Sequence, residues 1–334
     1  MNAELRFPAG TRVALTGASG FVGRQLTELL TATGADVLAL VRSTSKTADL
    51  EKLGVRCLPV DLDDPATIAA ALPGCDYLFH VAGAVDFKDD WDHLRRVNVQ
   101  GSLNALEAAR RAGVRRFVQT SSIVAIGATR TREVLSETAT WNLGPLAVGY
   151  ATTKREAEDA VLAARPAGVD VVVVNPACVI GPGDGGTSEF GALCKRFWKG
   201  RIPFYFAGGN NFVDVRDVAE GHVRAALFGK AGERYLLGGQ NLDYRHFFDI
   251  LAEIRKKRTF RVRLPVAFAP VMAWMEARLT KPNKRLYLPR GQARLMGYYF
   301  FGSSAKAEAE LGYRPRPVEH SLREAYRSYF GAPA

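Results

Sequence analysis

The sequence has little cysteine, no long apolar run and no N-terminal leader pattern, and each shortage excludes a class of protein. Only four cysteines occur in 334 residues, and they lie far apart with no CxxC pair or Cys/His cluster. Neither a disulfide framework nor a metal site is therefore indicated. No uninterrupted apolar stretch of about 18 residues occurs, and the N-terminus lacks a basic region followed by an apolar one. We expect a cytoplasmic protein that does not span a membrane.

Acidic residues are nearly absent from one basic segment near the C-terminus. The net charge is +11, and between Arg255 and Arg290 eleven lysines and arginines accompany a single acidic residue, Glu276. The charges flank an apolar stretch, LPVAFAPVMAWMEARL, instead of alternating with aromatic residues, so we expect no nucleic-acid partner. The segment 255–290 either covers the substrate as a solvated helix or rests peripherally on an anionic membrane.

Short apolar runs alternate with segments of helical spacing through the first half of the chain. The predicted strands are Arg12–Thr16, Asp36–Val41, Val55–Val60, Tyr77–Val81, Arg116–Thr120 and Asp170–Val174. Apolar runs of this length, separated by helical segments, are typical of buried parallel strands. The pattern predicts an α/β fold, a doubly wound parallel sheet of the Rossmann type with helices on both faces.

The alternation ends after Pro176, where glycine, proline and aromatic residues accumulate. We expect residues 1–177 to form the nucleotide-binding domain and residues 212–240 to return to it. Residues 178–211 and 241–334 then form mainly a smaller substrate domain, interleaved with the first.

Three glycines at the spacing GxxGxxG, Gly17, Gly20 and Gly23, follow the first predicted strand. Small residues at a strand-to-helix turn let the backbone approach a pyrophosphate, and the helix N-terminus supplies N–H donors. Glycines are common at turns, but the position after the first strand favours a dinucleotide site.

Arg42 ends the second predicted strand, with Lys46 nearby, where NAD-specific Rossmann proteins carry an acidic residue for the ribose. A guanidinium favours a 2′-phosphate, so NADP(H) is the preferred cofactor and NAD(H) the alternative. The alternative is that Arg42 is a solvated basic residue after a strand. Asp61 and Leu62 follow the third strand, where Asp61 either meets the adenine amino group or belongs, with the other acids of DLDDPAT, to the cap of the next helix.

Tyr150 and Lys154 stand four residues apart in GYATTKREAEDAVLAA, so a helix places them on one face. An ammonium group near a phenol stabilises the phenolate and lowers the phenol pKa from about 10. Tyr150 is then suited to act as the acid in ketone reduction and the base in alcohol oxidation. A Tyr-x-x-x-Lys pair by itself is more often an exposed pair on a helix surface than a catalytic pair. Other motifs in the chain are therefore needed to support a catalytic role.

Ser122 lies just beyond the fifth predicted strand, at the carboxyl edge of the sheet, where ligands bind in open α/β folds. A hydroxyl there can donate to a carbonyl oxygen that gains negative charge. Thr120 and Ser121, beside it, are assigned to structural or cofactor contacts.

Over nearly its full length the chain resembles the extended short-chain dehydrogenase/reductase family, the NAD-dependent epimerase/dehydratase type. The matching motifs are TGASGFVG from Thr16, Asp61-Leu62, HVAGAV around Ala82-Gly83, Asn98 with Gly101, TSS from Thr120, YATTK from Tyr150 and NPACVIGPGD from Asn175. The resemblance implies a Ser122, Tyr150, Lys154 triad, with Lys154 also holding the nicotinamide ribose. The further cofactor contacts that it implies are Ser19, Phe21, Val22, Ala82, Gly83, Asn98, Thr120, Pro176 and Val179. It also implies a homodimer, in which the segment Asp92–Ala112 and the Tyr/Lys helix pair with a partner.

Within that family, the later motifs NNFVDVRDVAEGHV and GERYLLGGQN are similar to bacterial dihydroflavonol-reductase-like proteins, a group that includes hopanoid-associated sugar epimerase-like proteins. Nucleotide-sugar epimerases carry an arginine for the substrate pyrophosphate where this chain has Asn210, which disfavours a sugar nucleotide. The expected pocket walls are Phe87, Trp91, Trp141, Phe204, Phe206 and the segment Leu264–Leu279.

We therefore expect an NADP(H)-dependent oxidoreductase that acts on the ketone or secondary alcohol of an apolar, lipid-like, polycyclic or phenolic small molecule. One alternative is a sugar or nucleotide-sugar epimerase that keeps its cofactor tightly bound and shows no net redox change. The other is a non-catalytic protein that only senses the dinucleotide, and the intact Ser122, Tyr150 and Lys154 argue against it.

Overall fold

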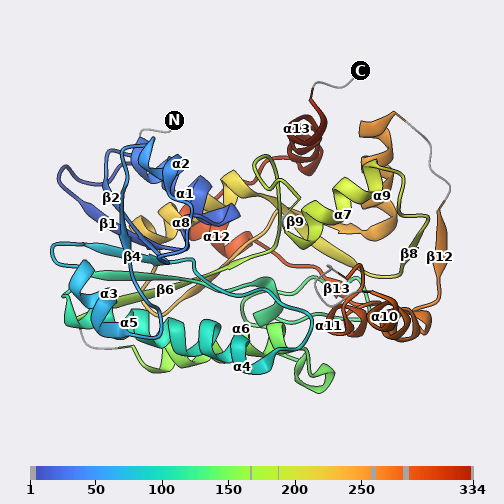
Figure 1. The fold of residues 1–334 in the computed structure, drawn as a ribbon, viewed down its shortest axis with the longest axis horizontal. Helices are drawn as coiled ribbons and strands as arrows, with labels where there is room; N and C mark the ends of the chain where they lie inside the picture. The colour runs from blue at the N-terminus through green and yellow to red at the C-terminus, as the bar shows by residue number, and fades with distance from the viewer. Residues whose placement is uncertain (1–4, 166–167, 187, 257–260, 281–285, 332–334) are drawn as a thin grey trace.

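The larger lobe of the protein is built on one parallel sheet. The computed structural model describes residues 5–165, 168–186, 188–256, 261–280 and 286–331. The strands of the sheet are β1 (Arg12–Thr16), β2 (Asp36–Val41), β3 (Arg56–Pro59), β4 (Tyr77–His80), β5 (Arg116–Thr120), β6 (Asp170–Pro176) and β10 (Arg234–Leu237). Their order is β10-β6-β5-β4-β1-β2-β3, and all neighbours pair in parallel (Figure 1). This arrangement confirms the predicted doubly wound Rossmann-type fold.

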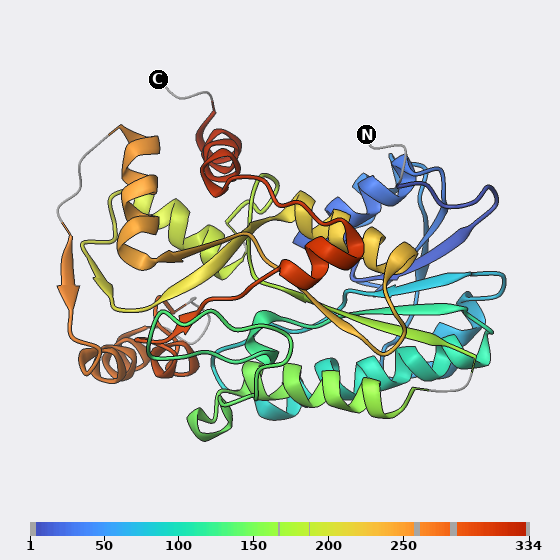
Figure 2. The ribbon, with the colours of Figure 1, turned by 180° about the vertical axis from the view of Figure 1, so that it is seen from behind.

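Helices cover both faces of this sheet, as Figure 2 shows from behind. One face carries α1 (Phe21–Ala32), α8 (Val215–Phe228) and α12 (Ala305–Leu311); the other carries α3 (Pro65–Ala71), the π-helical turn η1 (Arg95–Gln100), α5 (Gly101–Arg111) and α6 (Gly149–Ala163). Successive residues of β1 serve opposite layers, because side chains alternate along a strand. Val13 and Leu15 pack in the core beneath α1 and α8, and Ala14 packs in the core beneath α5.

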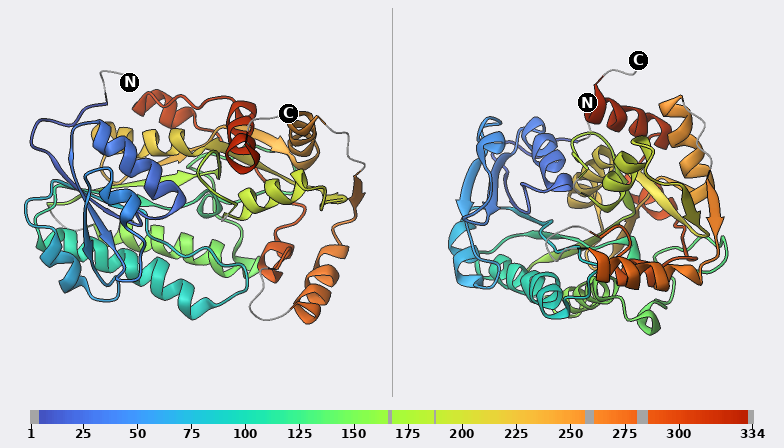
Figure 3. Two further views of the ribbon diagram at one scale, coloured as in Figure 1. Left: turned by 45° about the horizontal axis from the view of Figure 1, so that its top comes forward. Right: turned by 45° about the vertical axis from the view of Figure 1, so that its right-hand side comes forward.

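The smaller lobe is organised around β9 (Gly209–Asp214), as Figure 3 shows in two further views. This strand pairs antiparallel with β11 (Gln240–Asp243) and parallel with β7 (Cys178–Ile180) and β13 (Tyr299–Phe300). A separate parallel pair joins β8 (Phe204–Phe206) to β12 (Val262–Leu264). The helices of this lobe are α7 (Glu189–Trp198), α9 (Tyr244–Arg255), α10 (Phe268–Leu279), α11 (Arg290–Arg294) and α13 (Val318–Phe330). Its core includes Phe212 stacked on Phe247, with ring centroids 4.1 Å apart.

The chain passes between the two lobes several times. After β9, the helix α8 covers the large sheet, and β10 then pairs with β6 at its edge. The element α12 also packs on α8, although it lies within residues 241–334. Short segments complete the described fold: α2 (Ala48–Glu51), α4 (Trp91–Leu94), η2 (Ile123–Ala125) and η3 (Gly144–Leu146).

The described part of the chain lacks two further classes of feature. None of its helices combines the length and the apolar character that crossing a bilayer requires. No cluster of three or more histidine, cysteine, aspartate or glutamate side chains there is placed to hold a metal ion.

Candidate active site

The glycines after β1 form a turn that could not accommodate side chains. Gly17 has a φ of +75°, and a Cβ there would lie 2.6 Å from the backbone nitrogen of Ala82. A Cβ on Gly23 would lie 2.0 Å from the carbonyl oxygen of Gly17. The turn is therefore packed directly against the segment after β4. The residues at the N-terminus of α1 that follow the turn line a cavity.

A cavity of about 940 Å³ runs along the carboxyl edge of the large sheet and reaches the small lobe. The sequence-predicted residues that line it are Gly17, Ser19, Gly20, Phe21, Val22, Gly23, Arg42, Asp61, Leu62, Ala82, Gly83, Thr120, Ser122, Tyr150, Lys154, Pro176 and Val179. A glycine turn, a helix N-terminus and a long cavity at this edge fit an extended dinucleotide.

Two predicted cofactor residues, Lys46 and Asn98, do not line the cavity. Lys46 is exposed on the loop after β2. Asn98 is buried, and its amide nitrogen donates to Ala84 O at 3.1 Å and to Thr153 Oγ1 at 3.1 Å, while its Oδ1 accepts from Ala84 N at 2.8 Å. Asn98 therefore holds the Ala82–Ala84 segment in place behind the cavity wall.

The two residues expected near the adenosine lie at the rim. Arg42 is exposed at the end of β2, and among the described residues no carboxylate lies within 4.0 Å of its guanidinium. Asp61 accepts a hydrogen bond from Asp63 N at 2.9 Å, which forms a turn within the loop. The cap of α3 is Asp64, which accepts from Ala66 N at 2.9 Å. Asp61 is therefore not the helix cap.

The helix α6 carries Tyr150 and Lys154 on one face, toward the cavity. The ammonium group of Lys154 donates to Thr120 O at 3.0 Å, and the side chain is only 6% exposed. Burial lowers the pKa of Lys154 to about 8, and the carboxylate of Glu158 opposes this change. Lys154 is thus a cation held at the end of β5 with a pKa not far above neutrality.

The phenol of Tyr150 differs from the sequence expectation in one respect. Burial raises its pKa, and the hydrogen bond with Ser122 acts in the opposite direction. The expected lowering of the pKa by Lys154 is not what the geometry shows, because the Lys154 ammonium donates to the Thr120 carbonyl. The ring of Phe87 packs edge-on against Tyr150, with centroids 5.3 Å apart, and helps to exclude water from the phenol.

A buried polar network holds this group from behind. Asn175 donates to Ser122 O at 3.2 Å and to Glu158 Oε2 at 2.6 Å, and Arg234 donates to Glu158 Oε1 at 2.7 Å. The strands β6 and β10 therefore fix the carboxylate that faces Lys154. The position of Glu158, four residues after Lys154 on the same helix, could have indicated this contact from the sequence. The contact with Arg234 could not be predicted, because Arg234 is distant in sequence.

A second pair of hydrogen bonds fixes the end of β5. Thr120 Oγ1 lies 2.9 Å from His222 Nε2, and His222 Nδ1 lies 2.7 Å from Val218 O. Since the carbonyl can only accept, Nδ1 carries the proton and Nε2 accepts from the threonine. No sequence pattern predicts this contact, because Thr120 in β5 and His222 in α8 are 102 residues apart.

The far end of the cavity is mainly apolar and lies in the small lobe. The walls there include Phe190, Leu295, Met296 and Phe300. Asn210, Tyr244, Ser188, Glu189 and Gln292 add polar groups, and the Asn210 amide donates to the Tyr244 hydroxyl at 2.8 Å.

Most of the aromatic walls expected from sequence lie elsewhere. Phe87 lines the cavity as expected. Four other expected wall residues do not line it, namely Trp91, Trp141, Phe204 and Phe206. Trp141 donates to Val124 O at 2.9 Å in the core behind the cavity, and Phe204 and Phe206 pack under α10. None of the described residues of Leu264–Leu279 lines the cavity either. These large aromatic side chains pack between helices and strands instead of lining the cavity. Sequence spacing alone does not distinguish such a buried position from a position in a pocket wall.

The glycine turn, the long cavity and the buried Ser122, Tyr150 and Lys154 at its centre define a dinucleotide-dependent oxidoreductase. Comparison with known proteins agrees. The model of the NAD dependent epimerase/dehydratase family matches residues 13–238. The chain belongs to this family, an extended short-chain dehydrogenase/reductase family, and is an NAD(P)-dependent oxidoreductase.

Individual relatives cover nearly the whole chain. A putative dihydroflavonol 4-reductase of Synechocystis sp. is 34% identical over 93% of this chain and 92% of its own length. Sterol demethylase protein B of Methylococcus capsulatus is 33% identical over 93% of this chain and 96% of its own length. The crystal structure of gox2253 superposes with a TM-score of 0.83 at 32% identity, covering 96% of this chain and 98% of that one.

Proposed function

We propose that the protein is an NADP(H)-dependent reductase that converts the ketone of an apolar substrate to a secondary alcohol, or catalyses the reverse oxidation. The observation that carries the proposal is the position of Ser122, Tyr150 and Lys154, midway along one cavity. A glycine turn lies at one end of that cavity, and apolar walls lie at the other.

The residues at the first end fit the cofactor. Backbone groups of Gly17–Gly23 would hold the pyrophosphate at the N-terminus of α1, and Lys154 would contact the nicotinamide ribose. The unpaired guanidinium of Arg42 at the rim supports a preference for the 2′-phosphate of NADP(H) over NAD(H). When bound, the dinucleotide would supply the hydride.

The protein's own groups would manage the charge on the substrate oxygen. Ser122 would donate to the carbonyl oxygen, and the Tyr150 hydroxyl would deliver its proton there as negative charge develops. Because burial raises the pKa of Tyr150, the phenol stays protonated near neutral pH, which suits reduction. The Lys154 ammonium would stabilise the phenolate that remains.

The substrate end of the cavity supports an apolar compound. Its walls are mainly apolar, and the position at which nucleotide-sugar epimerases carry an arginine for the substrate pyrophosphate holds Asn210, whose amide donates to the Tyr244 hydroxyl. The names of two relatives refer to a dihydroflavonol and a sterol, both apolar ring compounds.

The family description favours one alternative, an epimerase of a sugar or nucleotide sugar that retains its cofactor. The two functions differ in whether the dinucleotide is consumed. Purified protein should oxidise added NADPH, followed by its absorbance, in the presence of polycyclic or phenolic ketones. Conversion of a nucleotide sugar to its epimer without net loss of NADPH, together with inertness toward the ketones, would replace the reductase proposal with the alternative.

A further inference from the structure

The exposed face of α10 carries larger apolar side chains than its buried face. Its exposed residues include Phe268, Val271, Trp274, Met275 and Leu279, and its fully buried ones are Ala269 and Ala273. Trp274 is 49% exposed and Leu279 is 85% exposed. A helix that only covers a core buries its large apolar residues, so this orientation is the reverse of the ordinary one.

These side chains form one continuous stripe. Their spacing along α10 is three to four residues, which places them on one side of a helix. The described part of the chain exposes eleven large apolar residues, and seven of them lie between Val262 and Tyr287. The apolar surface is therefore concentrated at α10, at the end of the small lobe (Figures 1 and 3).

Basic side chains surround the stripe. Arg263, Arg278 and Arg290 are exposed, and the Arg278 guanidinium lies 4.8 Å from the centre of the Trp274 ring. The single acidic residue of α10, Glu276, accepts from Leu288 N at 2.7 Å, so its charge is turned toward the backbone. Residues 257–260 and 281–285 of the basic segment lie outside the described residues.

The dimensions and composition of the stripe favour a lipid surface over a protein partner. A helix of 12 residues is about 18 Å long. A single helix face of this length offers less than the roughly 800 Å² that each partner contributes to a stable protein interface. Large apolar residues on one face with arginines beside them are the composition of helices that lie in the membrane interface. Arginine charge complements anionic lipid headgroups.

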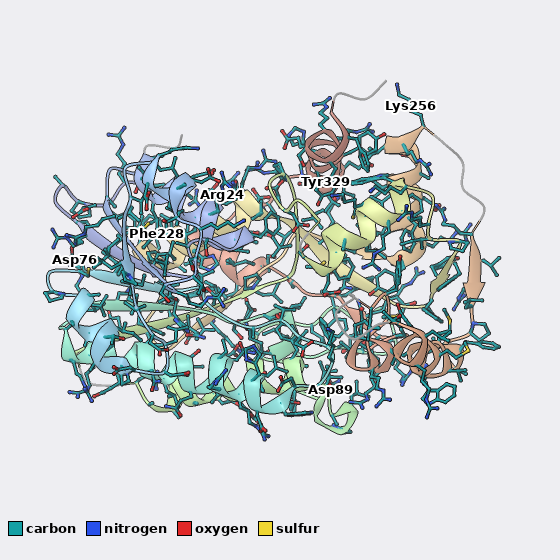
Figure 4. The ribbon with its side chains drawn as sticks, viewed as in Figure 1. Arg24, Asp76, Asp89, Phe228, Lys256 and Tyr329 are labelled. Atoms are coloured by element: carbon teal, nitrogen blue, oxygen red, sulfur yellow. The ribbon has the colours of Figure 1, made fainter. Side chains whose placement is uncertain are left out.

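The helix also lies next to the substrate end of the cavity. Its buried alanines pack with Ala293 of α11, and Leu295 and Met296, which follow α11, line the cavity. The loop residue Asp89, labelled in Figure 4, joins the same region through its ion pair with Arg294 at 3.2 Å. Only α11 and the residues that follow it would thus separate a membrane or protein bound to α10 from the apolar end of the cavity.

We propose that α10 docks the protein peripherally on an anionic membrane, with Phe268, Trp274, Met275 and Leu279 inserted among the lipid headgroups and the arginines bound to their phosphates. For the reaction proposed above, the docked helix would give apolar substrates a route from the bilayer. The docking itself requires no turnover, so it can fail while the reductase proposal stands, and the reverse also holds.

Vesicle flotation tests the docking. Wild-type protein should float with vesicles of phosphatidylcholine and phosphatidylglycerol at low salt, and less so with phosphatidylcholine alone or at high salt. The double variant W274Q/M275Q should reduce the partition coefficient about tenfold or more, because two large apolar side chains no longer enter the interface. The matched control is F228Q, since Phe228 is 46% exposed but lies on the large lobe, away from α10 (Figure 4).

Further readouts separate docking from misfolding and from self-association. The variants should keep the wild-type melting temperature and NADPH affinity, and W274F should still float while losing a blue shift of tryptophan fluorescence on vesicles. The proposal is overturned if wild-type protein does not float with anionic vesicles at low salt, or if F228Q weakens flotation as much as W274Q/M275Q. It is also overturned if W274Q/M275Q turns a lipid-free dimer into a monomer by light scattering, because the stripe would then face a second copy.

Discussion

Lys154 shows how the surroundings of one residue set the pH range of a reaction. The side chain is nearly buried, which lowers its pKa to about 8, while Glu158 acts in the opposite direction. Below about pH 8 the lysine is charged and can stabilise a Tyr150 phenolate; above it, this stabilisation is lost. For the proposed ketone reduction, the active form would therefore be the one with protonated Lys154.

This balance predicts the pH profile of the enzyme. Reductive kcat/KM should fall as pH rises through about 8. The variant E158Q keeps the shape of the side chain but removes the charge that raises the Lys154 pKa. Its alkaline limb should shift to lower pH by about half a unit to one unit, measured from pH profiles of both proteins. An unchanged limb in E158Q would show that another group controls it.

Arg42 carries the predicted choice of cofactor. Replacing it with alanine should weaken NADPH binding about 10- to 100-fold, because a charge-assisted contact with the 2′-phosphate is lost. NADH binding should change little, and fluorescence titration measures both. Lys46 offers a matched control, since it is exposed on the same loop but does not line the cavity. Equal losses in R42A and K46A would mean that the loop acts only through its overall charge.

Among the site residues, those with a short-range sequence pattern could be predicted from the sequence. Tyr150 and Lys154 share a helix face, and Ser122 follows a strand, so their meeting at one edge could be predicted. The structure also shows contacts that span the chain, such as Thr120 with His222 and Glu158 with Arg234. Those depend on which strands become neighbours, and single residue types in a sequence do not reveal that.

At the scale of elements, the turn between β1 and α1 is the most constrained. A methyl group on Gly23 would overlap the Gly17 carbonyl, at 2.0 Å. G23A should therefore lose dinucleotide binding and about 2–4 kcal/mol of unfolding free energy, measured by denaturant titration.

A control glycine lies in another helix. Gly101 has helical dihedral angles, and a Cβ there would find its nearest neighbour at 3.6 Å. G101A should be neutral or stabilise the protein by up to about 1 kcal/mol. If G23A were as harmless as G101A, the turn would not have the close packing described here.

The elements of the large lobe were more predictable than those of the small one. The apolar runs predicted Arg12–Thr16, Asp36–Val41 and Arg116–Thr120 at the bounds observed, because buried parallel strands need continuous apolar residues. The strands of the small lobe are short, and β13 has two residues. Strands this short show no detectable period-2 alternation of apolar residues in the sequence. β7, β11 and β13 are strands because each of them pairs with β9.

On the scale of the whole molecule, two buried histidines couple stability to pH. Burial lowers the pKa of His80 to about 3, with Lys154 contributing, and that of His222 to about 4. Both are neutral in the fold, whereas an unfolded histidine takes up a proton below about pH 6.5. Their contribution to stability is therefore complete above pH 6.5 and is lost progressively as pH falls toward the folded pKa values.

The His222 share of this effect can be measured. Lowering the pH from 6.5 to 5 should cost the wild-type protein about 1.5 kcal/mol of unfolding free energy through His222, and H222Q should show a correspondingly smaller loss over the same range. Denaturant titrations at the two pH values give the difference. A wild-type slope in H222Q would assign the acid sensitivity to other groups.

The assembly of the molecule stays a prediction. The resemblance implies a homodimer through the segment Asp92–Ala112 and the Tyr/Lys helix. In the structure, η1 and α5 lie beside α6 on one face of the large sheet, so both expected partners of such an interface are on the same side. The stripe on α10 belongs to the other lobe, which leaves it free to contact a membrane in either assembly state.

Tyr150 is the proposed proton donor of the reaction, and the variant Y150F tests this role most directly. Single-turnover reduction of an apolar ketone by NADPH should slow by about a hundredfold or more, since only the proton-donating hydroxyl group is removed. NADPH affinity, measured by fluorescence on the same protein, should stay within about twofold of wild type, since the phenol is not needed to hold the dinucleotide. Turnover at the wild-type rate in a Y150F protein that binds NADPH normally would contradict the assignment and the mechanism built on it.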